Sequence, residues 1–383
     1  MKLQELLKDV AVKNSTAAQD IEIKEVRYDS RAVQTGDLFV AIRGYATDGH
    51  KYIAKAMEQG AAAVVCEEAP EGVPAVVVEN SRIALAEIAA NRFGHPAESM
   101  VMLGVTGTNG KTTTTYLVKH MLEDAGHKVG LIGTNQNLIG QQALPAQRTT
   151  PDAYTLQSLL ARMEEAGCTH VVMEVSSHAL ALRRTAGLWF QAGIFTNLTR
   201  DHLDFHGTME AYRKAKGLLF QQCQTGIFNL DDGAGRQFAQ TAPCQAVTFG
   251  ETQGQAQVLA REIRLYPDRV SFQVHWPQGS CPVTLPIPGR FTVYNALGVL
   301  ACCLALGLPM DQAAGALAQI PGVKGRVEVV PVPAPYTVLI DYAHTPDALE
   351  KVLTAARDVT QCRLLCLFGC GGDRDRTKRP VMG

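Results

Sequence analysis

A glycine- and threonine-rich loop, GVTGTNGKTTTT at residues 104–115, constrains the fold more than any other feature of this chain. It follows the apolar run MVMLGV and opens an amphipathic helix, which is the strand–loop–helix context of a phosphate-binding loop. Gly107 and Gly110 lack a Cβ atom and so let backbone amides approach phosphate oxygens. Lys111 can reach the β- and γ-phosphates, and the Thr112 hydroxyl can bind Mg²⁺. The alternative is a plain turn before a helix.

The chain has 383 residues, enough for two or three domains, and 46% of them are hydrophobic. Residues 1–98 mix short β-rich runs with helical pieces and predict a small α/β domain. Residues 99–326 alternate Val/Ile/Leu-rich strands with helices, which is typical of a doubly wound parallel sheet. Within them, residues 255–285 predict a β excursion and residues 291–306 a helix. Residues 327–383 begin another strand–helix alternation with too few elements to cover both faces of a sheet, so we expect an incomplete third domain.

Charge and hydropathy exclude several classes of protein. Lys and Arg number 36 against 37 Asp and Glu, for a net charge of −1, which argues against general nucleic-acid binding. The start of the chain has no signal-peptide core, and its longest apolar stretch, residues 296–308, is too short to span a bilayer. We therefore expect a cytoplasmic protein, without membrane insertion, whose ten cysteines are reduced.

Three of those cysteines, Cys362, Cys366 and Cys370, are spaced by four in the run CRLLCLFGC. This spacing could indicate a metal site, but no Cys-x-x-Cys pair or nearby histidine supports one. The run is instead typical of a buried strand that enters a Gly-rich loop, and it predicts a strand there.

Two segments that follow apolar strands carry candidate metal ligands. Glu174 ends the strand in HVVMEVSSHAL, where a carboxylate suits a hard cation, although a strand-end acid can also be purely structural. The segment TNLTRDHLDFHG contains Asp201, Asp204 and His206, which could equally stabilise the loop. Its two histidines and two aspartates could indicate zinc, but beside an ATP site Mg²⁺ is the expected ion.

A lysine lies on an apolar helix face in MEAYRKAKGLLF. Tyr212, Lys216 and Phe220 recur every four residues and share one face, whereas Lys214 lies on another. The ordinary explanation is a lysine whose stem is buried and whose amine reaches solvent. The alternative is a buried amine with a lowered pKa.

The loop TGTNGKTTT is similar to that of the Mur ligases and of the related folylpolyglutamate synthetases, with Val105 standing where a strict phosphate loop has glycine. Matches to the Mur ligases run from Asp29 to Gly383. The resemblance implies three domains: a UDP-MurNAc-binding domain at 1–98, a central ATP-binding ligase domain at 99–326, and a Rossmann-like domain from 327 that brings the amino acid.

The resemblance also assigns the catalytic centre. It implies that Glu174 and His202 bind two Mg²⁺ ions and that Lys216 reacts with CO₂ to give a carbamate, an anionic ligand for the second ion. Lys111, Glu174, His202 and Lys216 are then the catalytic residues. The implied ATP-binding positions are Gly107, Thr108, Asn109, Gly110, Lys111, Thr112, Thr113, Asn295 (adenine), Arg326 (phosphate), Asp341 (ribose) and His344.

The segment RYDSRAVQTGDLFVAIRGYATDGH resembles the UDP-binding segment of the branch that adds the third residue of the cell-wall peptide. Tyr28 stands in place of a more usual apolar residue, and Arg148 and Leu182 in place of polar ones. The positions implied to hold UDP-MurNAc-dipeptide are Tyr28, Ser30, Tyr45, Ala46, Thr47, Thr149, Thr150, Ser176 and Arg184.

The implied reaction belongs to peptidoglycan synthesis. ATP phosphorylates the D-Glu side-chain carboxylate of UDP-MurNAc-L-Ala-D-Glu, and the amine of meso-diaminopimelate or L-lysine attacks the acyl phosphate. The segment FGCGGDRDRTKRP resembles the diaminopimelate-adding form, in which Arg374 contacts that ligand. Alternatively, Arg374 pairs with Asp373 or Asp375 in the loop.

Two other classes of function compete with this one. A folylpolyglutamate-synthetase-like ligase shares the loop and the lysine, but the uridine-type N-terminal segment argues against it. A non-catalytic protein that binds UDP-sugar-peptide and ATP is favoured by the incomplete third domain. In each case we expect a monomer.

Overall fold

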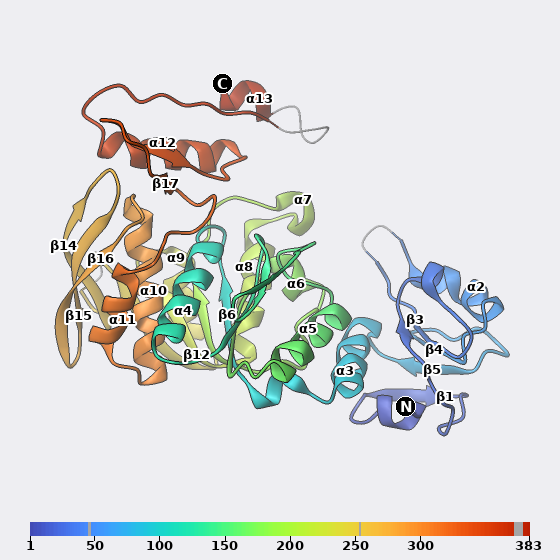
Figure 1. Ribbon diagram of the computed structural model, residues 1–383. Coiled ribbons are helices and arrows are strands. Elements are labelled where there is room, and N and C mark those ends of the chain that lie inside the picture. The colour runs from blue at the N-terminus through green and yellow to red at the C-terminus, as the bar shows by residue number, and fades with distance from the viewer. Residues whose placement is uncertain (45–46, 253, 371–377) are drawn as a thin grey trace.

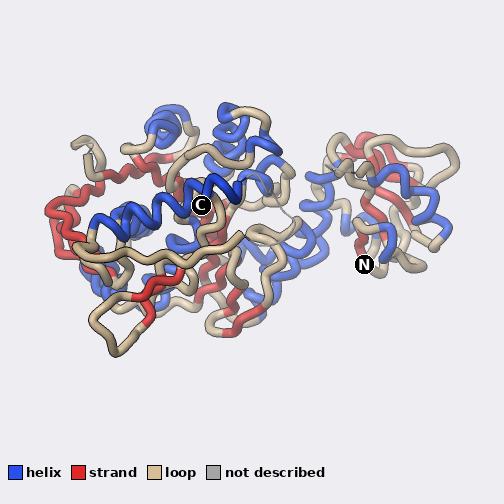
Figure 2. The backbone as a smooth tube through the Cα atoms, turned by 90° about the horizontal axis from the view of Figure 1, so that it is seen from above, coloured by secondary structure: helices blue, strands red, loops and turns tan. Residues whose placement is uncertain are grey.

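The structure is a computed structural model that describes residues 1–44, 47–252, 254–370 and 378–383. Within these residues the strands form a five-stranded, an eleven-stranded and a two-stranded sheet. The small N-terminal sheet lies to one side of the large sheet in both views, and the C-terminal segment with α12 lies beside the large sheet (Figures 1 and 2). The α/β class and the order of the three units agree with the prediction, while the boundaries at 98 and 326 stay predictions.

The N-terminal unit is a small sheet in which β2, β3, β4 and β5 run parallel and β1 pairs antiparallel with β5. Its longest helix begins where the Asn80 side chain accepts two backbone amides and ends at Gly94, which is left-handed with φ +75°. Its strands are β1 (Val12–Ser15), β2 (Val26–Arg27), β3 (Leu38–Val40), β4 (Ala63–Cys66) and β5 (Ala75–Val78), and its helices are α1 (Leu3–Leu6), η1 (Ser30–Ala32), η2 (Gly49–Tyr52), α2 (Ile53–Glu58), α3 (Ser81–Phe93) and η3 (Pro96–Ser99).

The large sheet has the order β16-β15-β14-β13-β12-β11-β6-β10-β7-β8-β9, with β7 and β10 to β14 parallel to β6. The strands are β6 (Val101–Thr106), β7 (Val129–Ile132), β8 (Asn137–Ile139), β9 (Gln142–Leu144), β10 (His170–Glu174), β11 (Phe190–Phe195), β12 (Cys223–Asn229), β13 (Gln245–Gly250), β14 (Val258–Leu265), β15 (Val270–Trp276) and β16 (Gly279–Leu285). Because parallel strands end at one edge, the segments after β6, β7, β10 and β11 meet there. That edge carries most of the predicted site.

Helices cover both faces of this sheet, as a doubly wound fold requires. They are α4 (Lys111–Asp124), α5 (Ala153–Glu165), α6 (Ser177–Ala181), α7 (Leu203–His206), α8 (Met209–Gly217), η4 (Leu218–Gln221), α9 (Gly233–Thr241), α10 (Arg290–Leu306) and α11 (Met310–Ala318). Alternation along β6 separates the two cores: Leu103 packs with α4, α10 and α11, and Met102 packs with α5, η4 and α9.

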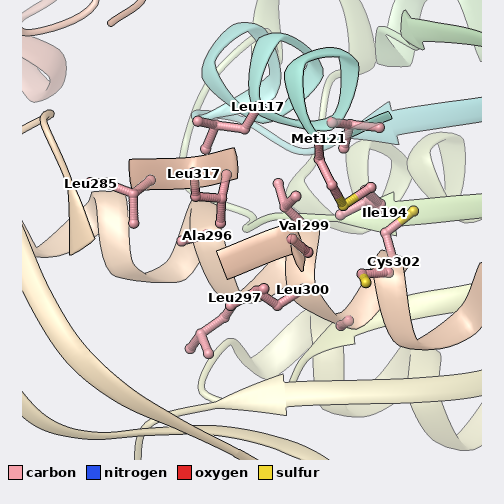
Figure 3. Close-up of a cluster of buried hydrophobic side chains, with 14 of the residues drawn as sticks. Leu117, Met121, Ile194, Leu285, Ala296, Leu297, Val299, Leu300, Cys302 and Leu317 are labelled. Carbon is pink, nitrogen blue, oxygen red and sulfur yellow. The ribbon is translucent and has the colours of Figure 1, made fainter. Parts of the chain in front are cut away.

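Helix α10 forms the centre of the first core. It is apolar on nearly every side, and Leu297, Val299 and Leu300 are fully buried among side chains of α4, α11 and the sheet (Figure 3). The predicted helix at 291–306 is therefore confirmed. In the described part of the chain no helix has the combined length and hydropathy that crossing a membrane requires.

The C-terminal unit departs from the prediction. It contains β17 (Glu328–Val330), β18 (Val338–Ile340), α12 (Pro346–Asp358) and α13 (Lys378–Met382), and its two strands pair antiparallel. The buried strand predicted in CRLLCLFGC is wrong, because this segment is irregular and Leu365 and Leu367 are 77% and 101% exposed. A strand needs the backbone of a neighbour, and none of the described residues pairs with this segment.

Replacing Leu297 with alanine tests the role of α10. We expect Leu297→Ala to lower the free energy of unfolding by about 2–5 kcal/mol, because a fully buried leucine leaves a cavity. Leu304→Ala, on the same helix but only partly buried, should cost less than half as much. Thermal and denaturant unfolding measure both, and equal losses would contradict a core centred on this helix.

Candidate active site

The phosphate loop connects β6 to α4, and its two central glycines are required by close contacts. A Cβ atom on Gly107 would lie 1.9 Å from the Thr196 hydroxyl oxygen, and one on Gly110 would lie 2.4 Å from Oδ1 of Asn295. Val105 is fully buried within β6, so the missing glycine lies in the strand and leaves the loop unaffected. Asn295, predicted at the adenine, thus lies against the loop.

Lys111 turns its amine back over the loop. Its Nζ donates to the carbonyls of Gly107 at 3.0 Å and Thr108 at 2.9 Å. Burial lowers the pKa of Lys111, as does the neighbouring Arg326, while Glu174 opposes the shift.

The segment after β11 holds the loop from the other side. Asn109 donates its backbone amide to Oδ1 of Asn197 at 3.0 Å, and its carbonyl accepts the hydroxyl of Thr196 at 2.7 Å. Sequence reasoning missed both residues as contributors to the site. The signal was present, since they are the first polar residues after an apolar strand.

Glu174, at the end of β10, is 1% exposed and held in one orientation. Thr134 donates its backbone amide to Oε1 at 2.8 Å and its hydroxyl to Oε2 at 3.0 Å. A Cβ atom on Gly133 would lie 2.6 Å from Oε1. The carboxylate is therefore fixed by the segment after β7, another contribution that the sequence did not reveal.

Lys216 is 1% exposed, so the ordinary explanation for a lysine on an apolar helix face, an amine that reaches solvent, is wrong here and the buried alternative is correct. Its Nζ donates to the Gly107 carbonyl at 2.6 Å and lies 4.5 Å from the centre of the Tyr212 ring. Burial and the charge of Lys111 hold the pKa of Lys216 well below its ordinary value, with Asp201 opposing them. Two lysine amines thus meet at one carbonyl oxygen.

His202 lies in the loop before α7, in a left-handed conformation with φ +52°. Burial lowers its pKa, and so do the charges of Lys111 and Lys216, against the attraction of Asp201. Asp201 also accepts the backbone amide of His202 at 2.8 Å, and His206 bonds to the Ser177 hydroxyl at 3.0 Å. These two residues have the loop-stabilising contacts that the sequence left open.

Arg326 connects the third unit to the phosphate loop. Its Nη2 donates to the Thr112 hydroxyl at 3.1 Å, and its guanidinium lies 5.3 Å from the centre of the Tyr342 ring. Asp341 accepts two backbone amides of its own region at 2.8 and 2.7 Å, and His344 bonds to the Tyr342 carbonyl. These contacts place Asp341 and His344 in the same unit as Arg326, which itself contacts the loop.

Four predicted substrate residues gather beside Glu174. The Thr150 hydroxyl donates to the Glu174 carbonyl at 2.8 Å and accepts the Ser176 amide at 3.0 Å. Nη1 of Arg184 donates to the Thr150 carbonyl at 2.9 Å, and the Thr149 hydroxyl lies 3.0 Å from the Thr134 hydroxyl, whose single proton is donated to Glu174. Two segments that are 26 or more positions apart in the sequence, one with Thr149 and Thr150 and the other with Ser176 and Arg184, thus form one polar cluster.

The N-terminal unit meets the central one at Tyr154 of α5. Its hydroxyl donates to Glu25, and its ring lies 6.3 Å from that of Tyr28. Ser30 is buried at the start of η1, and the Thr47 carbonyl accepts a backbone amide in a turn. Three other predicted positions lie outside the described residues: Tyr45, Ala46 and Arg374.

Family models match most of the chain. The Mur ligase family catalytic domain matches residues 22–93, the Mur ligase middle domain residues 105–303, and the Mur ligase glutamate ligase domain residues 325–383. The chain belongs to the Mur ligase family. The resemblance inferred from the phosphate loop is thereby confirmed.

Named relatives of this Mur ligase add detail. A Clostridium botulinum protein, UDP-N-acetylmuramoyl-L-alanyl-D-glutamate–2,6-diaminopimelate ligase, is 44% identical over 94% of this chain and 76% of its own. A Roseiflexus protein, UDP-N-acetylmuramyl-tripeptide synthetase, is 43% identical over 100% of this chain and 80% of its own. A solved structure of a UDP-N-acetylmuramoyl-L-alanyl-D-glutamate–2,6-diaminopimelate ligase has a TM-score of 0.81 at 30% identity, covering all of this chain and 79% of that one. Folylpolyglutamate synthase of Mycobacterium tuberculosis, at 16% identity and a TM-score of 0.57, shares the fold.

Two glycines allow a matched test of the loop. Gly110 and Gly126 both have φ +87°, but a Cβ atom would meet Asn295 only at Gly110 and nothing within 4 Å at Gly126. Both alanine variants should lose about 1 kcal/mol of stability from the left-handed backbone. Only Gly110→Ala should weaken ADP binding, by about tenfold or more, in calorimetric titration. Equal ADP affinity in the two variants would show that the contact with Asn295 is unimportant.

The buried Lys216 amine predicts a pH dependence of stability. The unfolded chain binds this proton up to pH 10.5, whereas the folded chain releases it at a lower pH. The free energy of unfolding should therefore rise with pH from the lowered pKa up to 10.5. In CO₂-free buffer, Lys216→Met should flatten this rise and stabilise the protein at neutral pH, while Lys214→Met, at a side chain 72% exposed, should not. An unchanged pH slope for Lys216→Met would contradict the buried state.

Proposed function

We propose that this Mur ligase couples meso-diaminopimelate to the D-Glu side-chain carboxylate of UDP-MurNAc-L-Ala-D-Glu, with conversion of ATP to ADP and phosphate. The relatives named for this reaction are 42–45% identical to the chain. The observation that supports the chemistry most is the convergence of Lys111 and Lys216 on the Gly107 carbonyl, beside the oriented carboxylate of Glu174. The reaction belongs to peptidoglycan biosynthesis.

The phosphate loop binds and orients the nucleotide in this proposal. Backbone amides at the start of α4 face the phosphates, and Lys111 neutralises charge on the transferring phosphoryl group. The substrate carboxylate oxygen forms a bond to the γ-phosphorus as the bond to ADP breaks. The amine then attacks the acyl carbon, loses a proton, and inorganic phosphate leaves. No protein nucleophile takes part, so the site needs only to position the substrates and to neutralise the charge of the transferring phosphoryl group.

The side chains present fit Mg²⁺. Glu174 and Thr112 offer hard oxygen atoms, and Mg²⁺ takes its other ligands from phosphates and water. Within the described ranges no three His, Cys, Asp or Glu side chains form a ready-made metal site, which suits an ion held largely by its nucleotide. When bound, Mg²⁺ neutralises charge on the phosphoryl oxygens.

In this proposal Lys216 provides a ligand for a second Mg²⁺ ion beside His202. A lysine ammonium repels a cation, but a buried neutral amine can attack CO₂ and lose a proton to give a carbamate. The carbamate replaces a positive group by an anionic oxygen ligand. The low pKa of Lys216 favours this modification.

The acceptor lies across two units in this proposal. Thr149, Thr150, Ser176 and Arg184 hold the peptide end beside Glu174, and Tyr28, Ser30 and Thr47 hold the uridine end, with Tyr45 and Ala46. Arg184 is the cation of this cluster, and burial lowers its pKa because the guanidinium loses contact with water. An anionic substrate group would take the place of that water and stabilise the charge. Arg374 contacts the incoming amino acid.

Substrate-dependent ADP release tests the proposed function. With UDP-MurNAc-L-Ala-D-Glu and ATP, meso-diaminopimelate should support turnover well above that with L-lysine. Preferred turnover with L-lysine would assign the lysine-adding form instead, and turnover with glutamate and a folate would transfer the protein to the other ligase class. If the protein binds ATP and the UDP-substrate but releases no ADP, it is a non-catalytic binding protein.

A pair of arginine variants controls this assay. Lys216→Arg keeps a cation that cannot form the carbamate, and it should lower kcat roughly a hundredfold or more. Lys214→Arg, two residues away and exposed, should retain wild-type kcat. Addition of bicarbonate should raise the activity of the wild type and of Lys214→Arg only.

A further inference from the structure

Tyr212 is a buried side chain with no role in the proposed ligase reaction. It is 0% exposed and lies on α8 one turn before Lys216, so the two side chains share one face of the helix. An apolar stripe on α8 explains burial of a ring at this position, but a phenylalanine would satisfy the stripe equally well. The hydroxyl therefore calls for a separate explanation.

The ring of Tyr212 forms one wall of the Lys216 site. Nζ of Lys216 lies 4.5 Å from the ring centre and 2.6 Å from the Gly107 carbonyl oxygen. The aromatic ring and the carbonyl oxygen thus both lie next to the amine and restrict its position. With a smaller side chain at position 212 the flexible lysine chain would have room to move.

The hydroxyl of Tyr212 reaches the phosphate loop. It lies 3.2 Å from the Thr108 hydroxyl, which also donates to the Thr199 carbonyl at 3.2 Å and accepts the Thr199 amide at 3.0 Å. The single proton of Thr108 is thus committed to Thr199, so Tyr212 donates and fills the second lone pair of the Thr108 oxygen. This bond ties α8 to the loop at a residue next to Gly107.

The Tyr212 ring also lies beside the histidine segment. The ring of His206 lies 5.1 Å from that of Tyr212, and the ring of His202 lies 6.0 Å away, nearly perpendicular. One buried side chain thus contacts the loop, the lysine and the predicted metal-binding histidine, which come from three separate segments.

We propose that Tyr212 is a positioning residue of the ligase centre: its hydroxyl fixes the phosphate loop through Thr108, and its ring holds the Lys216 amine in place for modification by CO₂. The role of the ring at Lys216, the lysine half of this inference, rests on the proposed function. The ring and the hydroxyl are different groups of atoms, so single substitutions separate their two roles.

The hydroxyl is tested with Tyr212→Phe, which keeps the ring. ADP affinity, measured by calorimetric titration, should fall about three- to tenfold for loss of one buried hydrogen bond. The carbamate signal in ¹³C NMR after addition of ¹³C-bicarbonate should persist. An ADP affinity within about twofold of the wild type would overturn the role of the hydroxyl.

The ring is tested with Tyr212→Leu, matched to Phe220→Leu. Phe220 lies one turn beyond Lys216, is 1% exposed and packs on Phe228 and Phe238 instead of the loop. Both variants lose a buried ring and should lower the melting temperature, but only Tyr212→Leu should lose the carbamate signal. Equal carbamate signals in the two variants would overturn the role of the ring. A wild type without carbamate would overturn the lysine half together with the proposed modification, while ADP affinity would still report on the hydroxyl.

Discussion

Two lysine side chains converge on one backbone oxygen, the carbonyl of Gly107, and the arrangement of the whole site follows from that contact. Lys111 reaches it from the start of α4, and Lys216 reaches it from α8, more than a hundred residues later. Two ammonium groups this close repel each other, and burial disfavours both charges, so the pair is stable only with one amine neutral or with an anion between them. This pair of amines therefore favours a bound anion such as a polyphosphate, and under the proposed function it also favours the neutral amine that CO₂ would modify.

The sheet makes this convergence possible. Strands β6, β10 and β11 run parallel and adjacent, so the loop, Glu174 and the Thr196 segment leave the same edge within two strand spacings. Small residues are then needed wherever the segments cross. Gly107, Gly110 and Gly133 each face an oxygen atom closer than any Cβ could approach. Neighbours from distant parts of the chain require all three glycines, and Gly107 and Gly110 are also required by their positive φ angles.

The sequence predicted those features that depend on local pattern. The loop after an apolar strand, the apolar helix α10 and the shared face of Tyr212 and Lys216 all follow from spacing along the chain, and the structure contains each of them. The state of Lys216 could not follow from spacing, because a lysine on an apolar stripe is buried or solvated according to what covers the helix. Thr134 was missed for a similar reason, since its partner Glu174 lies 40 residues away. The false strand in CRLLCLFGC shows the opposite limit: apolar alternation predicts a strand but cannot supply the neighbour that pairs with it.

The contact between Tyr154 and Glu25 has a consequence for substrate length. Glu25 and Tyr28 belong to the N-terminal unit, and Tyr154 belongs to the unit that carries Lys216. Under the proposed function, a substrate bound at its nucleotide end by one unit and at its carboxylate by the other must span the distance between the two units. A precursor one residue shorter or longer, bound at its nucleotide end, would then place a different atom at the lysine pair.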